Sequence, residues 1–260
     1  MSADARPSPA TVNAVVIAGG RDKPELLAAG GARSRSLMLI GGRSMIERTL
    51  AALRDAHLVA RIAVVAPAEI GSTVDACWCD EFRPAVESPA QNLLLGAQAV
   101  GEDRPVLLST GDLPLLTAQA VDDFVERGLR TGADVVYPVV SAVHSERRFP
   151  VAPRTYARLR DGTFTGGNIV LTRGDFVRTH LELIDRLFEL RKHKLRLARF
   201  LGWSFLIRFA LGRLRLSDLE ARGGAIIGGR VAALISSYPE IGFDVDKVDD
   251  LELARRALGE

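Results

Sequence analysis

Short apolar runs alternate with amphipathic helical patterns along this chain, and this alternation limits the fold more than any other feature. The apolar runs cover residues 12–18, 61–66, 105–109 and 133–140, and helical patterns include 44–56 and 117–132. Strands that alternate with helices are typical of a mainly parallel sheet wrapped by helices. We therefore predict an α/β fold, in which ligands bind beyond the carboxyl ends of the strands.

The length and composition fit one domain with a substantial core. The chain has 260 residues, 47% of them hydrophobic, and a formal net charge of only +2. This balance does not indicate a nucleic-acid partner. We expect a disordered tail at 1–11, which is small, polar and proline-containing, and a single domain over 12–260. The sequence shows no secretory signal and no apolar stretch long enough to cross a bilayer, so we expect a cytoplasmic protein.

Two adjacent glycines follow the first apolar run, where a parallel strand would end. Gly19 and Gly20 come directly after Ala18, and Arg21 and Lys23 stand just beyond them. Paired glycines let backbone N–H groups approach a ligand that side chains would exclude. The pattern is consistent with a phosphate-binding loop and also with an ordinary turn.

Acidic residues follow two other expected strands. Asp112 stands in the sequence GDLP after the run at 105–109, where it could hold a divalent cation or cap a turn. Near the C-terminus we expect a short strand and then Asp244 and Asp246, which as residues i and i+2 of an extended segment would share a face and could hold one ion. Asp249 and Asp250 are expected to begin the last helix, where acids offset the helix dipole.

A second glycine pair comes later in the chain. Gly166 and Gly167 precede Asn168 and another apolar run. The amide of Asn168 could hydrogen-bond a base or an acceptor group, or it could close a turn.

The segments AVVIAGG, LMLIGGRSMIERTLAAL, LLSTGDLPLLT, FTGGNIVL and FDVDKVDDLELA occur in this order. Together they resemble the MobA-like NTP transferase family of nucleotidyltransferases, over roughly residues 12–180 and 238–259. The resemblance implies a Rossmann-like sheet of the nucleotide-diphospho-sugar transferase (glycosyltransferase A) type. It also implies Mg²⁺-dependent transfer of an NMP from an NTP to a phosphorylated or hydroxyl acceptor, with release of pyrophosphate. The acceptor implied is a small molecule, soluble or lipid-linked.

The resemblance further implies roles for individual residues. Mg²⁺ would be held by Asp112 and by Asp244 or Asp246. The acceptor is assigned to Gly166, Gly167 and Asn168. The nucleotide is assigned to the first glycine loop and to the segment where relatives contact the base, at Ala18, Gly19, Gly20, Arg21, Ser88 and Asn92.

One position departs from the family pattern. Arg35 stands where a lysine is expected, and Arg35 and Lys23 are the cations that would meet the triphosphate, so both are assigned to catalysis with Asp112. Arginine neutralises phosphate as lysine does, but as a planar fork rather than a compact point charge. Direct displacement by the acceptor needs no covalent nucleophile, and the sequence contains no convincing Ser/His/Asp or Cys/His arrangement.

Two other functions stay open from the sequence. A glycosyltransferase that uses a sugar nucleotide would share the sheet and could use Asp244 and Asp246 as its metal pair. A non-catalytic nucleotide-binding protein is suggested by Arg35 at the lysine position.

The family pattern does not explain a basic segment late in the chain. No acidic residue stands between Glu189 and Asp218, and residues 192–216 mix arginines with apolar residues at roughly helical spacing. We expect a helical insertion at about 180–235. Its apolar side would pack on the sheet or contact an anionic membrane surface peripherally.

Overall fold

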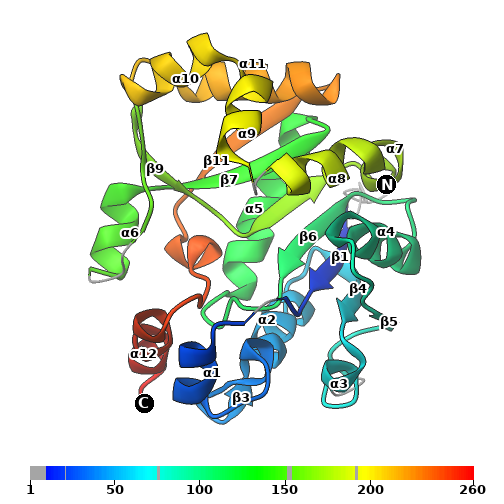
Figure 1. Ribbon diagram of the computed structural model, residues 1–260. Helices are drawn as coiled ribbons and strands as arrows, with labels where there is room; N and C mark the ends of the chain where they lie inside the picture. The colour runs from blue at the N-terminus through cyan, green and yellow to red at the C-terminus, as the bar shows by residue number, and fades with distance from the viewer. Residues whose placement is uncertain (1–9, 21, 75–76, 151–153, 191–192) are drawn as a thin grey trace, which may run out of the picture.

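The computed structural model describes residues 10–20, 22–74, 77–150, 154–190 and 193–260. Within them, a nine-stranded sheet has the order β5-β4-β1-β6-β10-β7-β9-β8, and β11 pairs with β7 (Figure 1). The strands are β1 (Val12–Ile17), β4 (Val59–Ala66), β5 (Glu81–Pro84), β6 (Val106–Thr110), β7 (Val135–Ser141), β8 (Ala157–Leu159), β9 (Gly162–Gly166), β10 (Ile169–Thr172) and β11 (Val231–Ser236). The α/β Rossmann-like fold is thus confirmed.

The sheet is mixed but mostly parallel. Strand β1 pairs in parallel with β4 and β6, and β11 pairs in parallel with β7, whereas β10 runs antiparallel between β6 and β7. Because β10 is antiparallel, the residues that precede it lie at the same edge as the residues that follow β1 and β6. The first glycine pair, Asp112 and the second glycine pair therefore reach one edge of the sheet.

Helices cover both faces of the central strands. Successive residues of a strand point to opposite faces, so Ala14 and Val16 join a core with Leu50 and Phe124, while Val15 joins another with Val100. The helices that supply these cores are α2 (Met45–Arg54), α4 (Pro89–Val100) and α5 (Ala118–Thr131). The predicted helices at 44–56 and 117–132 are thus confirmed.

Helix α2 begins where the sequence specifies it. The Ser44 hydroxyl accepts a hydrogen bond from the Glu47 amide at 3.3 Å, and the Glu47 carboxylate accepts one from the Ser44 amide at 2.8 Å. This reciprocal pair satisfies two N–H groups that a helix start leaves without partners.

Small elements pack beneath the glycine loop. They form a cluster in which Leu26 and Met38 contact Phe243 and Leu251. The small elements that contribute to this cluster are α1 (Pro24–Gly30), β2 (Leu39–Ile40) and α12 (Val248–Ala257). Around it, η1 (Arg35–Leu37) contacts α1, β3 (Arg43–Ser44) pairs with β2, and η2 (Pro239–Gly242) packs through Ile241 in the core of Leu50 and Phe124. This packing brings residues near 35 and near 246 to the end of β1.

The prediction of a short strand before Asp244 is wrong, because the short helix η2 forms there. Pro239 has its ring nitrogen at the first turn of η2, where a helix start needs no N–H donor. The apolar run that does form a strand lies earlier, as β11, where all six residues pair with β7.

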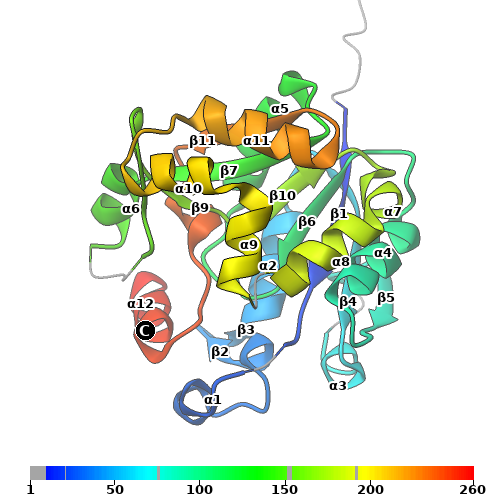
Figure 2. The same ribbon diagram turned by 45° about the horizontal axis from the view of Figure 1, so that its top comes forward.

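Between β10 and β11 the chain is helical, as expected, but only as far as Ile227. The helices are α7 (Phe176–Thr179), α8 (Leu181–Leu190), α9 (Lys194–Leu201), α10 (Trp203–Ala210) and α11 (Leu216–Ile227). Helices α10 and α11 lie at the end of the molecule opposite α1 and α12 (Figures 1 and 2). Two short helices, α3 (Ala68–Gly71) and α6 (Ala142–Arg148), complete the fold.

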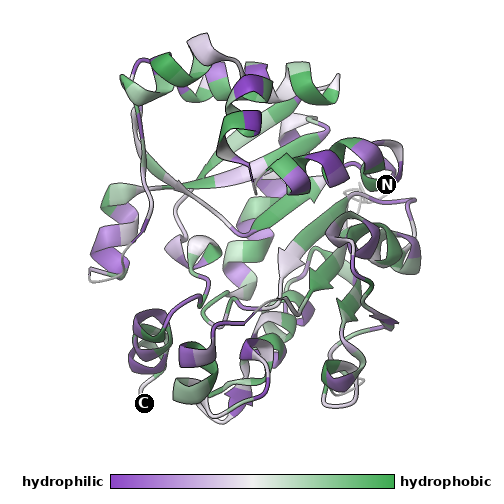
Figure 3. Ribbon diagram, in the orientation of Figure 1, coloured by the Kyte–Doolittle hydropathy of each residue, from purple (hydrophilic) through white to green (hydrophobic). Residues whose placement is uncertain are grey.

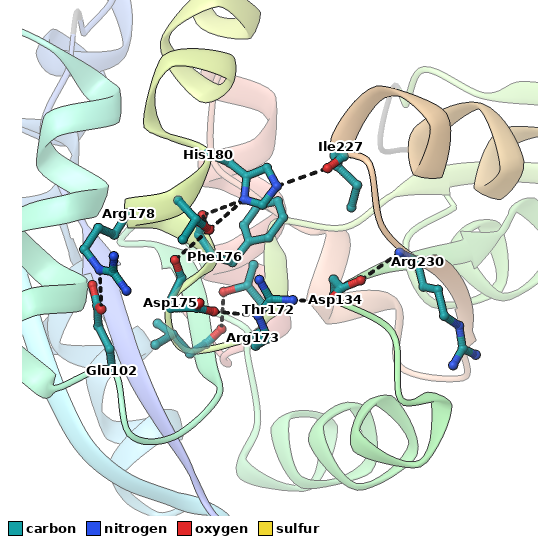
Figure 4. A network of polar contacts seen from close by, with 12 residues as sticks. Glu102, Asp134, Thr172, Arg173, Asp175, Phe176, Arg178, His180, Ile227 and Arg230 are labelled. Carbon is teal, nitrogen blue, oxygen red and sulfur yellow. Dashed lines mark hydrogen bonds and ion pairs between the residues drawn. The ribbon is translucent and has the colours of Figure 1, made fainter.

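A polar network fixes the start and end of this helical segment at one place (Figure 4). The His180 ring nitrogen Nε2 lies 3.0 Å from the Ile227 carbonyl oxygen, and the His180 ring stacks on Phe176 with centroids 4.2 Å apart. Arg173 pairs with Asp134 and Asp175, each at 2.5 Å. His180 therefore has a packing role.

The expected tail at 1–11 falls mostly outside the described residues, which begin at residue 10. Among the helices that the structure describes, none combines the length and the apolar character that a membrane span requires.

Gly96 tests the packing of α4 on the sheet. A Cβ atom at this position would lie 2.2 Å from Val15 Cγ1, so Gly96→Ala forces the helix away from β1 and costs about 1–3 kcal/mol of unfolding free energy. Gln98→Ala on the exposed side of α4 is the control and should change stability by less than about 0.5 kcal/mol. Urea unfolding measures both, and equal stability of the two variants would contradict this packing.

Candidate functional site

The first glycine loop requires glycine for two physical reasons. Gly19 and Gly20 have φ values of 104° and 144°, a region that side-chain-bearing residues rarely adopt. A Cβ at Gly19 would also lie 2.6 Å from the Pro67 ring, whereas nothing lies within 4 Å of one at Gly20. The Ala18 amide donates to Val65 and completes the strand pairing. Gly20 thus faces open space, while Arg21 lies outside the described residues.

Asp112 follows β6 at the same edge of the sheet. The preceding Gly111 amide donates to the Ile17 carbonyl at 3.0 Å, and a Cβ on Gly111 would lie 2.9 Å from that of Ala18. The chain therefore crosses close beside β1 before Asp112 turns into the protein, where its residue is only 5% exposed.

Arg35 brings three acidic residues together. Its Nη1 lies 3.2 Å from Asp112 Oδ2 and also contacts Asp246 Oδ1, and its Nε lies 3.3 Å from Asp22 Oδ1. Burial lowers the pKa of Arg35, but Asp112, Asp246 and Asp22 outweigh it, so the pKa is raised above its ordinary value. Arg35 is therefore a cation surrounded by carboxylates from distant parts of the sequence.

Burial controls the acidity of Asp112. It raises the pKa of this carboxyl above its ordinary value, although the Arg35 charge and a hydrogen bond from the Thr110 side chain oppose the shift. Among the described residues, Asp112 Oδ1 has no hydrogen-bond partner. A buried acceptor oxygen without a partner is costly in a folded protein, and a bound cation would satisfy it.

The acidic pair Asp244 and Asp246 divides between two arginines. Asp244 Oδ1 accepts a hydrogen bond from Arg154 Nη1 at 2.9 Å, whereas the Asp246 carboxylate contacts Arg35. Lys23 Nζ donates to the Asp246 backbone carbonyl at 3.1 Å. Asp246, rather than Asp244, therefore shares an ionic partner with Asp112.

Asp250 has the helix-starting role expected of it. Its carboxylate accepts hydrogen bonds from the backbone amides of Asp246 at 3.2 Å and Lys247 at 3.0 Å. These bonds satisfy free N–H groups at the start of α12 and fix the turn that carries Asp246.

The donor set fits a hard divalent cation that also contacts a substrate. Across the described parts of the chain, no three acidic, histidine or cysteine side chains gather into a complete metal site. The Asp112 and Asp246 carboxylates nevertheless reach the same nitrogen of Arg35, and Asp112 Oδ1 is unsatisfied. Mg²⁺ is commonly held by one or two carboxylates together with waters and substrate phosphates.

The second glycine pair lines a polar pocket beside these carboxylates. Tyr137 and Pro138 crowd this pair, because a Cβ at Gly166 would lie 2.3 Å from the Tyr137 hydroxyl and one at Gly167 would lie 2.7 Å from Pro138. The pocket has a volume of about 360 Å³. Its lining includes Arg154, Gly166, Gly167, Asn168, Asp244, Asp246 and Lys247. The residues assigned to the acceptor thus share a cavity with the acidic pair.

The two residues assigned to the base have partners within the fold. The Ser88 hydroxyl accepts from the Gln91 amide at 3.3 Å as the cap of α4, and it lies 3.1 Å from Asp185 Oδ1. Asn92 accepts from the Val86 amide at 2.7 Å and donates to the Val86 carbonyl at 2.9 Å. Asn92 therefore shapes the loop before α4 and has its amide engaged there.

Sequence reasoning missed three charged residues of this region. Asp22 is an acid within an otherwise basic stretch beside Gly20, and this break in charge was the available signal. Lys247 directly follows the acidic pair and lines the pocket. Arg154 stacks over Phe243 at 4.6 Å and reaches Asp244 from a segment that carries no motif.

A family model for the MobA-like NTP transferase domain matches residues 14–196, which is more than half of the chain. The chain belongs to this family. It is accordingly a transferase of the nucleotidyltransferase type, as the sequence motifs indicated.

Solved structures agree with this assignment. A hypothetical transferase from Thermus thermophilus is 37% identical, with a TM-score of 0.81, over 93% of this chain and 99% of that one. A nucleotidyl transferase from Methanothermobacter thermautotroptrophicus is 18% identical, with a TM-score of 0.56, over 95% and 97%. A 4-diphosphocytidyl-2C-methyl-D-erythritol synthase from Anaerococcus prevotii is 12% identical, with a TM-score of 0.54, over 96% and 97%. The last two show the fold alone. Among curated proteins, no sequence matches this chain.

Removing Arg35 should destabilise the ligand-free protein in a pH-dependent way. Arg35→Ala leaves the buried Asp112 carboxylate without its cation, which costs about 3 kcal/mol at neutral pH and raises the pKa of Asp112 further. A carboxyl with a raised folded-state pKa holds its proton longer when folded, so stability falls as the pH rises between the ordinary and the raised value. The stability that Arg35→Ala loses relative to the unmodified protein should therefore become smaller as the pH falls.

Melting temperatures across a pH series measure this effect. Arg130→Ala, which removes a mostly exposed arginine paired with Glu126 on α5, is the control. A deficit for Arg35→Ala that stayed constant from neutral to acidic pH would argue against the role given to Asp112.

Asn92 allows the base-contact assignment to be tested. Asn92→Ala removes both hydrogen bonds to Val86 and should lower stability by about 1–3 kcal/mol. Thermal unfolding and the Kd for NTP are measured together, with Gln91→Ala on the exposed side of α4 as the control. A higher Kd for NTP at unchanged stability would instead support direct contact between Asn92 and the base.

Proposed function

We propose that this protein transfers an NMP group from an NTP to a phosphate or hydroxyl oxygen of a small acceptor, releases pyrophosphate and requires Mg²⁺. The observation that carries the proposal is the convergence of Asp112, Asp246 and Arg35 beside the loop at Gly19 and Gly20. A site with two carboxylates and a cation suits a polyphosphate–metal complex, because the carboxylates attract the metal and the cation attracts the phosphates.

The nucleotide would lie over the first glycine loop. Gly20 leaves space above the backbone, so N–H groups there can approach phosphate oxygens. Arg35 and Lys23 would turn from the acidic residues toward the triphosphate once a metal neutralises the carboxylates. Arg35 at the family's lysine position thus keeps a cation in the site.

Asp112 and Asp246 are the residues that would hold Mg²⁺. When bound, this ion neutralises phosphate oxygens and orients the triphosphate. The acceptor would enter the pocket lined by Gly166, Gly167 and Asn168, which opens beside Asp246.

The transfer is a single displacement. The acceptor oxygen forms a bond to the α-phosphorus as the bond to the bridging oxygen breaks, and that oxygen leaves with pyrophosphate. The residues of the chain position the two reactants and compensate charge, which matches the lack of a nucleophile-and-base pair in the motifs. The proposed partners are thus an NTP and a small acceptor, and contact of residues 192–216 with a membrane would give access to a lipid-linked one.

The split of the acidic pair also bears on the alternatives. A glycosyltransferase that used Asp244 and Asp246 together would need both carboxylates at one ion, whereas Asp244 contacts Arg154. A protein that only binds nucleotide would need no acceptor pocket, yet the pocket of about 360 Å³ adjoins the carboxylates.

Three substitutions test the metal assignment. Asp112→Asn and Asp246→Asn should each lower Mg²⁺-dependent pyrophosphate release on the order of 100-fold or more, because each removes a ligand charge. Asp244→Asn should have a smaller effect, mainly on the KM for the acceptor. The melting temperature of Asp112→Asn should stay within a few degrees, since burial already disfavours the ionised Asp112 that is lost.

The assay measures pyrophosphate release from each common NTP with a panel of phosphorylated sugars, alcohols and cofactor precursors. If Asp244→Asn proved more damaging than Asp246→Asn, the metal assignment would be wrong. Release from sugar nucleotides alone would favour a glycosyltransferase, and NTP binding without turnover on any acceptor would favour a nucleotide-binding protein.

A further inference from the structure

Helices α9 and α10 expose a line of large apolar side chains. Trp203, Ile207 and the C-cap residue of α10, Leu211, recur every four residues and are 57%, 58% and 58% exposed, and Leu195 on α9 is 77% exposed. Residues at this spacing lie on one side of a helix. Hydrophobic residues colour much of α10, although this helix lies at the edge of the molecule (Figure 3). We call these four residues the outer apolar line.

Core packing does not require the outer apolar line. The inner side of α10 already packs through Phe205, which contacts the cluster that includes Val139, Phe164 and Leu214. The basic segment was expected either to pack on the sheet or to contact a membrane surface. Helix α10 allows both, because one of its sides packs on the sheet and the other faces solvent. An exposed apolar line of this kind on a soluble fold indicates a contact surface.

The surface beside the outer apolar line is basic. Arg196 and Arg199 line a pocket of about 650 Å³ with Leu195 and Trp203, and neither arginine forms an ion pair with any residue that the structure describes. Arg186, which lies over the Phe200 ring at 5.2 Å, and His193 also line it, and Glu189 is the acid at its edge. On α10, Arg208 pairs with Asp218 at 3.1 Å.

We propose that the surface formed by α9 and α10 docks on a bilayer that contains anionic lipids. The outer apolar line would enter the boundary between headgroups and acyl chains, with Trp203 at the level that amphipathic aromatic rings prefer. Arg196 and Arg199 would lie against lipid phosphates, because arginine binds phosphate with a planar fork. The chain would then lie on the membrane without crossing it.

Charge favours a bilayer over the other occupants. A two-fold contact with a second copy would bring two surfaces of the same positive charge into one interface, which is repulsive. A nucleic acid would match the arginines but would leave Ile207 and Leu211 in water. An anionic bilayer matches both the charge and the apolar line.

Helix α8 connects the docking surface with the start of α4. Helix α8 lines the basic pocket through Arg186 and Leu190, and its Asp185 lies 3.1 Å from the Ser88 hydroxyl at the start of α4. Docking does not depend on the proposed function. If that function holds, docking also defines the acceptor class as a phosphate or hydroxyl carried on a lipid.

Vesicle co-sedimentation without nucleotide tests the docking. The full chain should sediment with phosphatidylglycerol–phosphatidylcholine vesicles at low salt, less at physiological salt, and weakly with phosphatidylcholine alone. Arg196→Glu/Arg199→Glu should weaken binding at least roughly tenfold through lost attraction to the anionic surface. Ile207→Asp should do the same by placing a charge in the apolar boundary.

Matched variants control for charge and for exposure. Arg130→Glu/Arg256→Glu changes the net charge equally on α5 and α12, and Val143→Asp alters a 75% exposed residue on α6. Both should bind vesicles like the unmodified chain. In Trp78→Phe, which leaves Trp203 as the single tryptophan, emission should shift to shorter wavelength on addition of anionic vesicles.

Three results would overturn the proposal. They are no binding to anionic vesicles at low salt, equal binding to neutral vesicles, or equal loss in the control variants. Dimers that Ile207→Asp abolishes, without vesicle binding, would assign the surface to a second copy. Pyrophosphate release with soluble acceptors is assayed separately, so failure of docking and failure of transfer are distinguishable.

Discussion

The arrangement at the end of β1 and β6 depends on one guanidinium group. Arg35 contacts carboxylates from residues 22, 112 and 246, and without it these groups would repel one another at short range. The cluster in turn holds the glycine loop, the end of β6 and the start of α12 together. In the proposed reaction the same groups exchange partners, since the carboxylates would bind the metal and Arg35 the phosphates.

The sequence predicted the central strands of the sheet because their signals are local. Continuous apolar runs indicated β1, β4, β6, β7 and β10. Ser44 caps the start of α2, and Thr117 caps the start of α5, where its hydroxyl accepts from the Ala120 amide. The sequence did not predict β5, β8, β9 or β11, and it predicted a strand where η2 forms. A short run such as Val231–Ser236 becomes a strand only by pairing with β7. Strand β7 precedes β11 by almost 100 residues in the sequence, so no local sequence pattern indicates this pairing.

The site was predicted in part for the same reason. Asp112 and the first glycine pair follow strands, so their place at the sheet edge could be inferred. The second glycine pair precedes β10 and reaches the same edge only because β10 runs antiparallel, which the sequence did not indicate. The division of Asp244 and Asp246 between Arg154 and Arg35 could not be inferred, because it depends on how residues distant in sequence pack together. Asn92 is an opposite case. Its position in the sequence suggested contact with the nucleotide base, but its side chain instead hydrogen-bonds to Val86 in the loop before α4.

The contact between His180 and the Ile227 carbonyl has an architectural consequence. The chain leaves the sheet after β10 and returns to it at β11 through points that touch, so α8 to α11 form a loop closed at its base. Closing such a loop costs little more entropy as it lengthens, and its length does not alter the spacing of the strands. The same base could therefore carry helices of another size or chemistry while the glycine loops and acidic residues at the opposite edge keep their positions.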